Sequence, residues 1–176
     1  TRFECSNYDN AAESQTADDF ESDLDVWART GDEADLIWSR DTDAAGNHLW
    51  HGVDYSSLSD TALVSPALTV SADESFVMSW KHRYTFETSP ENPNDPGSPN
   101  VFWDGSVVEI SSDGGGTWED VSVYADPGYG GQIGNLAENP LADRDGYVDQ
   151  NASWPALDAV TLDSGELLAG KTVKVR

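Results

Sequence analysis

The sequence predicts an all-β protein, an antiparallel two-sheet β-sandwich of jelly-roll type. In residues 74–87 the large apolar and aromatic side chains fall on every second position, which is typical of a strand with one buried face. Several such runs follow one another, separated by turn residues, without a sustained helical period. The composition of seven Trp and six Tyr with one Met also favours sheets over a helical bundle.

The expected elements can be taken along the chain. Residues 1–19 are polar and aperiodic, which indicates a lead-in or linker, and the sandwich domain is expected over residues 20–176. Pro66 requires an edge or a bulge in its strand. Segment 125–151 is rich in Gly, Asn, Asp and Pro, so we expect a long irregular loop that is functional or held by an ion. The strands are expected at 26–30, 35–40, 48–53, 61–70, 74–87, 101–110, 117–124, 157–164 and 171–176.

The clearest local motif spans residues 111–118, where the spacing S-x-D-x-G-x-T-W is that of an Asp-box hairpin. We expect the Asp113 carboxylate to accept N–H groups of the loop, and Trp118 to pack beneath it. The glycines around Gly115 allow the positive φ that such a turn needs.

Alternation also predicts which side chains form the core. Glu109 shares a strand face with Val107, so both are expected to point away from the core. The expected core residues are Phe76, Met78, Trp80, Val108, Ile110, Trp118, Val173 and Val175.

The charge balance narrows the classes of partner. With 33 acidic and 9 basic residues the formal charge is −24, which would repel nucleic acid and anionic membranes. Divalent cations such as calcium are the expected small partners, and a merely solvated acidic surface suited to salt is the alternative. No apolar run is long enough to span a bilayer. The single Cys5 cannot form a disulfide within the chain.

Seven segments in order carry a resemblance to a known family. They are Phe20-Glu21, ALVSPALTV, SWKHRYTFE, WDGSVVEISSDGGGTW, GYGGQI, NPLADRDGY and LLAGKTVKVR. This series resembles a MAM-like jelly-roll module found beside the catalytic domains of secreted bacterial metallopeptidases of the immune-inhibitor-A and fungalysin-like groups. The resemblance covers nearly everything after Asp19.

The resemblance implies a secreted, non-catalytic accessory module. Its expected partners are a neighbouring catalytic domain of the same precursor and a protein or polysaccharide substrate or surface. In the family pattern a closing strand with a Trp-x-x-Asp-Asp segment follows Arg176, so we expect this chain to lack that strand and to leave a sheet edge unpaired. Two alternatives stay open: a structural or adhesive spacer, and a carbohydrate-binding module that uses Trp38, Trp50, Trp103 and Tyr129.

Calcium, if bound, is expected to be structural. The resemblance places Glu21 near Asp104, and carboxylates from distant strands suit the flexible oxygen coordination of calcium. Asp143 and Asp145 in the long loop form a second candidate, with charge neutralisation by Arg144 as the alternative. Segment 41–47 begins like a calcium loop but lacks its fifth-position ligand and terminal Glu, which indicates a plain turn.

The sequence does not predict an enzyme. It contains no G-x-S-x-G elbow, no H-E-x-x-H pair and no phosphate-binding glycine loop. His48 and His51 lie three apart on an expected strand, so their rings point to opposite faces and cannot share a metal. His82 falls on the apolar face and is expected to be a core residue. Glycoside hydrolysis by a carboxylate pair is the weakest hypothesis, since 33 acidic residues produce such pairs by chance.

Overall fold

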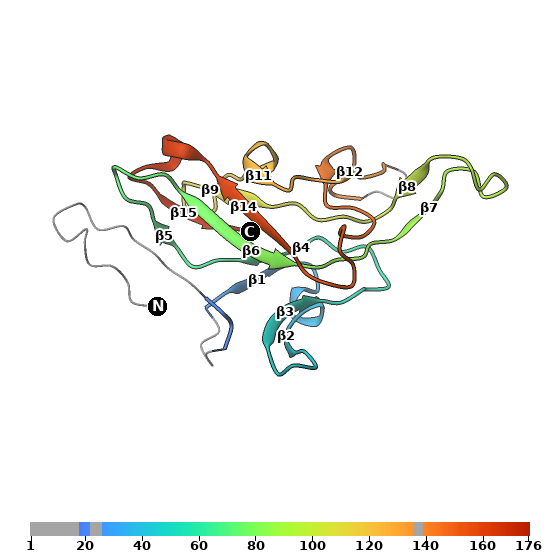
Figure 1. Ribbon diagram of the computed structural model, residues 1–176, viewed down its shortest axis with the longest axis horizontal. Coiled ribbons are helices and arrows are strands. Elements are labelled where there is room, and N and C mark those ends of the chain that lie inside the picture. The colour runs from blue at the N-terminus through green and yellow to red at the C-terminus, as the bar shows by residue number, and fades with distance from the viewer. Residues whose placement is uncertain (1–17, 22–25, 136–138) are drawn as a thin grey trace. The chain divides into compact units, whose positions relative to one another are not determined.

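The computed structural model describes residues 18–21, 26–135 and 139–176 (Figure 1). The prediction for residues 1–17 and Cys5 therefore lies outside the described residues. The chain divides into two compact units, the first formed by residues 1–76, 110–118 and 166–176, and the second by 77–109 and 119–165. In the described ranges most elements are strands in antiparallel sheets, so the predicted all-β class is confirmed. None of the helices there is long and apolar enough to cross a membrane.

The first unit consists of short antiparallel pairs. Strand β1 pairs with β4, β2 forms a hairpin with β3, and β15 lies between β9 and β5. The bounds are β1 (Ala28–Gly31), α1 (Ala34–Ile37), β2 (Trp38–Thr42), β3 (His48–Gly52), β4 (Thr61–Val64), β5 (Leu68–Thr69), β9 (Glu109–Ser111), η3 (Gly165–Leu168) and β15 (Thr172–Val175). The first residue of β9, Glu109, and the first residue of η3, Gly165, belong to the second unit, while the rest of both elements belongs to the first.

The second unit contains the longest ladder, in which β14 lies between β11 and β6. The register pairs Asp158 with His82 and Asp163 with Val77, and Figure 1 shows β6 and β14 running side by side. The hairpin β7–β8 extends away from these strands (Figure 1). The bounds are β6 (Val77–His82), β7 (Thr88–Pro90), β8 (Asn100–Phe102), β10 (Glu119–Asp120), η2 (Ser122–Tyr124), β11 (Ala125–Asp126), β12 (Gly131–Gln132), β13 (Asp145–Gly146) and β14 (Asp158–Asp163).

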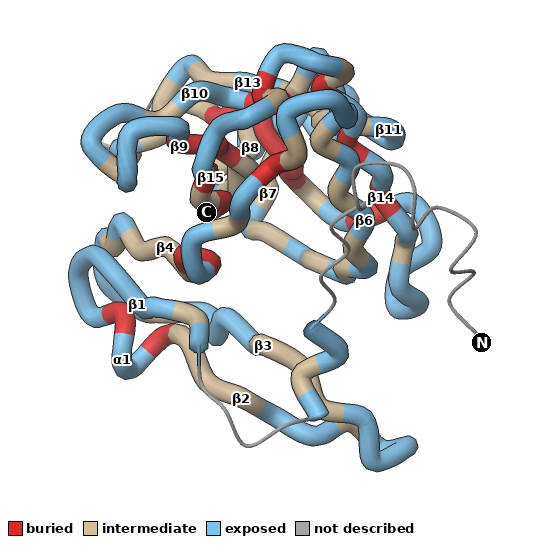
Figure 2. The backbone as a smooth tube through the Cα atoms, turned by 90° about the vertical axis from the view of Figure 1, so that its left-hand side faces the viewer, coloured by how far each residue is buried: buried red, intermediate tan, exposed pale blue. Residues whose placement is uncertain are grey.

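Several strands differ from the prediction. The chain forms α1 where a strand was expected from residue 35, because Ala34 and Ile37, three residues apart, both become buried on one side of a helical turn (Figure 2). The break between β4 and β5 falls at Pro66, as its missing N–H predicts. Beside it, the Ser65 hydroxyl accepts the Val175 N–H at 2.9 Å. The expected strand 101–110 is interrupted between β8 and β9.

The described residues of segment 125–151 are more regular than expected. They contribute β11 and the pair β12–β13, and Ile133 among them has no exposed surface. Gly105 makes this packing possible, since a Cβ on it would lie 2.7 Å from the Ile133 Cδ1. The predicted loop is therefore partly a structural element whose backbone is held by short ladders.

The core agrees in part with the prediction. Of the expected residues, Ile110, Val173 and Val175 are buried, and the other five are half-buried. The deepest positions of β14, Val160 and Leu162, alternate with exposed ones (Figure 2). The outward prediction for Glu109 is wrong, because this residue is only 5% exposed and its carboxylate accepts a hydrogen bond from Arg144.

Candidate functional site

Asp113 organises the turn of residues 111–118. Its Oδ1 accepts the N–H groups of Gly116 at 2.8 Å and Thr117 at 2.9 Å, and its Oδ2 accepts the Thr117 hydroxyl at 2.8 Å. The Ser111 hydroxyl donates to Asp113 Oδ1 at 2.7 Å and accepts the Gly115 N–H at 2.8 Å. The expected role of Asp113 as an acceptor for the loop is therefore present in full.

These hydrogen bonds favour the ionised form of the Asp113 carboxyl. The Thr117 N–H first, and then the Ser111 and Thr117 hydroxyls, hold the pKa of Asp113 well below its ordinary range. Trp118 packs against the same turn, since a Cβ on Gly115 would lie 3.6 Å from the indole. The Arg176 guanidinium also contacts Trp118 and lies 4.5 Å from the centroid of its ring.

Other aspartates also accept backbone N–H groups in turns. Each accepts at least one backbone N–H from a residue two to five positions away, as Asp43 does from Ala45 and Asn47 in the turn between β2 and β3. Segment 41–47 is thus a turn, as expected. The other members of the set are Asp18, Asp19, Asp95, Asp120, Asp158 and Asp163. Part of the acidic excess is therefore engaged in holding turns.

The first calcium candidate, Glu21, is bound to the start of β3. Its Oε1 accepts the His48 N–H at 2.8 Å, and its Oε2 lies 3.1 Å from His48 Nδ1. The neighbouring Phe20 carbonyl accepts a hydrogen bond from the Arg40 guanidinium. Glu21 belongs to the first unit, whereas Asp104, its expected partner, is an exposed residue of the second unit.

The second calcium candidate consists of Asp143 and Asp145, which lie on either side of Arg144 in the sequence. Arg144 Nη2 donates to Glu109 Oε1 and to Asp120 Oδ2, both at 2.8 Å, so it does not neutralise its sequence neighbours. The Asp143 and Asp145 side chains are exposed. In the part of the chain that the structure describes, no three His, Cys, Asp or Glu side chains are grouped closely enough to hold a metal ion. Calcium binding stays a prediction.

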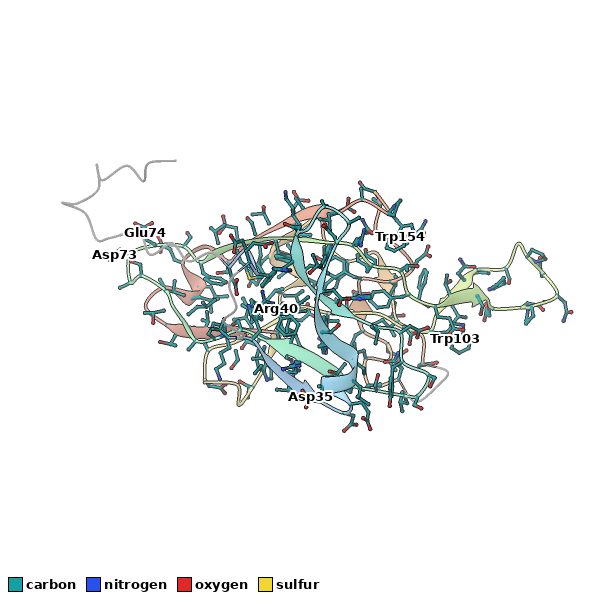
Figure 3. The ribbon with its side chains drawn as sticks, turned by 90° about the horizontal axis from the view of Figure 1, so that it is seen from below. Asp35, Arg40, Asp73, Glu74, Trp103 and Trp154 are labelled. Atoms are coloured by element: carbon teal, nitrogen blue, oxygen red, sulfur yellow. The ribbon has the colours of Figure 1, made fainter. Side chains whose placement is uncertain are left out.

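Two of the aromatic candidates lie on the β2–β3 hairpin. Trp38 is paired with Gly52, and a Cβ on this glycine would lie 3.3 Å from the indole, so the ring covers the glycine backbone. Trp50 is paired with Arg40 and has the Arg29 guanidinium 5.7 Å from its ring centroid (Arg40 is labelled in Figure 3). Both indoles are half-buried and engaged by their own chain.

The other two aromatic candidates belong to the second unit. Trp103, at the base of the β7–β8 hairpin in Figure 3, donates from Nε1 to Ser89 Oγ at 2.8 Å. The Tyr129 hydroxyl accepts the Val108 N–H at 2.8 Å and donates to the Val108 carbonyl at 3.2 Å. Burial, the largest influence, raises the pKa of Tyr129. The four aromatic candidates thus divide into two pairs in separate units.

The three histidines have different partners, and His82, expected in the core, is half-buried. His48 contacts Glu21, whereas His51 Nδ1 lies 2.8 Å from Asp41 Oδ2, so the two rings have different carboxylate partners. His82 belongs to a row of aromatic rings, and its centroid lies 5.1 Å from that of Tyr84 and 4.7 Å from that of Tyr147. Burial lowers the pKa of His82, against a smaller opposing effect of Asp158.

Trp154 was not among the binding residues predicted from the sequence. At 40% exposure it is the most open Trp of the described residues, and it lies on the turn that leads into β14 (Figure 3). Its signal was the Trp-Pro pair between two short strands, which indicates a turn rather than a buried face.

Comparison with known proteins finds no matching protein family, no similar curated protein and no similar solved structure.

Proposed function

We propose that this chain is a non-catalytic accessory module of a secreted multidomain protein, and that it binds a macromolecule for a neighbouring peptidase domain. The arrangement of its strands is proposed to be a two-sheet jelly-roll, and the turn of residues 111–118 an Asp box. The observation that carries the proposal is the use of carboxylates in the turns. Asp113 is the main example, with three hydrogen bonds from Gly116 and Thr117.

This use of side chains favours binding over catalysis. A general base or nucleophile needs a group free to exchange protons with substrate near neutral pH. The Asp113 and Asp158 carboxylates instead have pKa values lowered by hydrogen bonds within their own turns. Such turns make a rigid support, which is the property that a binding module requires.

Deleting residues 20–176 from the precursor tests this function. We expect the kcat/KM for a short peptide substrate to stay unchanged, because the chemistry belongs to the neighbouring domain. Turnover of a large or surface-bound substrate should fall, because the module no longer holds it. Equal loss on both substrates, or hydrolysis by the isolated chain, would contradict the proposal.

We further propose that calcium stabilises the module without reacting. An ion that binds only the folded state adds about 2.7 kcal/mol at a hundred times its dissociation constant. The expected result is a higher thermal midpoint in calcium than in excess chelator, with magnesium as the control ion. Glu21→Gln and Asp143→Asn separate the two candidate positions. An identical midpoint in calcium and chelator would leave the acidic surface merely solvated.

A carbohydrate-binding module is the second candidate function. The four aromatic residues expected from the sequence are half-buried and contact their own chain, which weakens them as a sugar platform. Trp154 is the observation that favours this function, because its indole is exposed on a firmly held turn.

A further inference from the structure

We propose that the turn of residues 151–158, with the adjoining outer face of β6, binds a neutral polysaccharide. One sugar ring would stack on Trp154, while its hydroxyl groups hydrogen-bond to Arg83 and Lys81. This inference rests on the proposed binding function and names both its site and its ligand class.

The exposure of Trp154 is the first step. Of the seven Trp in the chain, all of them in the described ranges, six are half-buried and Trp154 is 40% exposed. Leu157 on the same turn is 50% exposed. An exposed indole offers a flat apolar surface to the C–H face of a sugar, and its N–H remains able to donate.

The turn that presents Trp154 is held from inside by Asn151, which is only 2% exposed. The Asn151 Nδ2 donates to the Ala156 carbonyl at 2.9 Å and to Asp158 Oδ2 at 3.0 Å. Its Oδ1 accepts the backbone N–H of Tyr84 at 3.2 Å, and the backbone N–H of Trp154 donates to the Asn151 carbonyl at 3.0 Å. A turn fixed in this way loses little conformational entropy when a ligand binds.

The polar part of the site comes from the extended run that begins with β6. Exposed and half-buried residues alternate there, so Ser79, Lys81 and Arg83 share the exposed side. Arg83 Nη1 donates to the Pro155 carbonyl at 3.3 Å, which places the guanidinium beside the Trp154 turn. Across the ladder Lys81 faces Ala159, a small residue that leaves the ammonium accessible. An aromatic surface beside a few placed polar groups is the usual composition of a ligand site.

The charges favour a neutral ligand. The formal charge of −24 opposes a polyanion over the length of a polymer. A polycation would in turn meet Lys81 and Arg83 on the face next to Trp154. A neutral polysaccharide encounters neither penalty, and its hydroxyl oxygens accept hydrogen bonds from both cations.

Affinity electrophoresis tests the site. The chain is run in native gels containing hydroxyethylcellulose, glucomannan or soluble starch, with polygalacturonate as the anionic probe. At least one neutral polysaccharide should retard the chain, and Trp154→Ala should weaken the association by about tenfold or more. Trp154→Phe should retain part of the affinity, and Arg83→Ala should lose part of it. Tyr124→Ala is the matched control, because Tyr124 is an exposed aromatic of the same unit, at 38%, and should not change the retardation.

Three results would overturn the inference. The first is no retardation of the parent chain by any neutral polysaccharide. The second is equal retardation of the parent, Trp154→Ala and Trp154→Phe chains, each with an unchanged far-UV circular dichroism spectrum. The third is retention by polygalacturonate alone that disappears in about 0.5 M NaCl, which marks an ionic contact. None of these affects the precursor comparison above, so loss of the sugar site and loss of the accessory function can be told apart.

Discussion

At the scale of single residues, the buried carboxylate of Glu109 is the largest departure from simple alternation. Its side chain is 7% exposed and is neutralised by Arg144, whose own side chain is 32% exposed and also contacts Asp120. Removing one partner of a buried ion pair costs about 3–5 kcal/mol, because it leaves an uncompensated charge in the interior.

Arg144→Met should therefore destabilise the chain. Solvent reaches about a third of the arginine, so we expect the free energy of unfolding to fall by about 2–3 kcal/mol rather than the full amount. Urea denaturation measures the loss. The double variant Arg144→Met with Glu109→Met should recover part of it, because no charge is left buried. A double variant less stable than Arg144→Met would show that Glu109 stabilises the fold by other contacts.

Asp113→Ala should lower the thermal midpoint, since the N–H groups of Gly116 and Thr117 lose their acceptor. Asp73→Ala is the matched control, because it removes the same charge from another exposed turn. The folded-state pKa of Asp113 lies below its ordinary 3.8, so its stabilisation is complete above pH 3.8 and is lost as the pH falls further. The difference between parent and Asp113→Ala chains should shrink over that acidic range, and a constant difference would contradict this account.

At the scale of elements, the turn before β14 depends on Asn151. Asn151→Ala removes two donors and leaves the Tyr84 N–H without its acceptor, which should cost about 1–3 kcal/mol. Hydrogen exchange should accelerate at the Tyr84 amide, and polysaccharide affinity should fall with the loss of the fixed turn. Asn100→Ala, in an exposed position of β8, is the control. An unchanged Tyr84 exchange rate in Asn151→Ala would show that the turn is held by other groups.

Among the elements, those with a clear side-chain pattern could be predicted from the sequence. Strands β6, β14 and β15 were found because their side chains alternate over four residues or more. The helix α1 was missed because one turn is too short to show a period. Glu109 was misplaced because its partner, Arg144, is 35 residues away, and no local pattern reports so distant an ion pair.

At the scale of the whole molecule, the acidic composition was predictable but its use was only partly so. The turn residues around Asp113 predicted its role as an acceptor of loop N–H groups. The same role of Asp158 could not be predicted, because its donors, Asn151 and Ser153, come from the preceding turn. The aromatic candidates were chosen by residue type, yet exposure decides which Trp can meet a ligand. Exposure follows from packing, so Trp103 and Trp154 could be told apart only in the structure.

The central claim is that the chain binds a macromolecule without cleaving it. The most direct measurement is size-exclusion chromatography with light scattering, which gives the mass of a polymer and of its complexes. The polymers are a neutral polysaccharide that retards the chain in native gels and a protein substrate, each measured before and after prolonged incubation with the chain. We expect a complex that contains the chain and a polymer mass that does not change with time. A steady fall in polymer mass that scales with the amount of chain added would contradict the account.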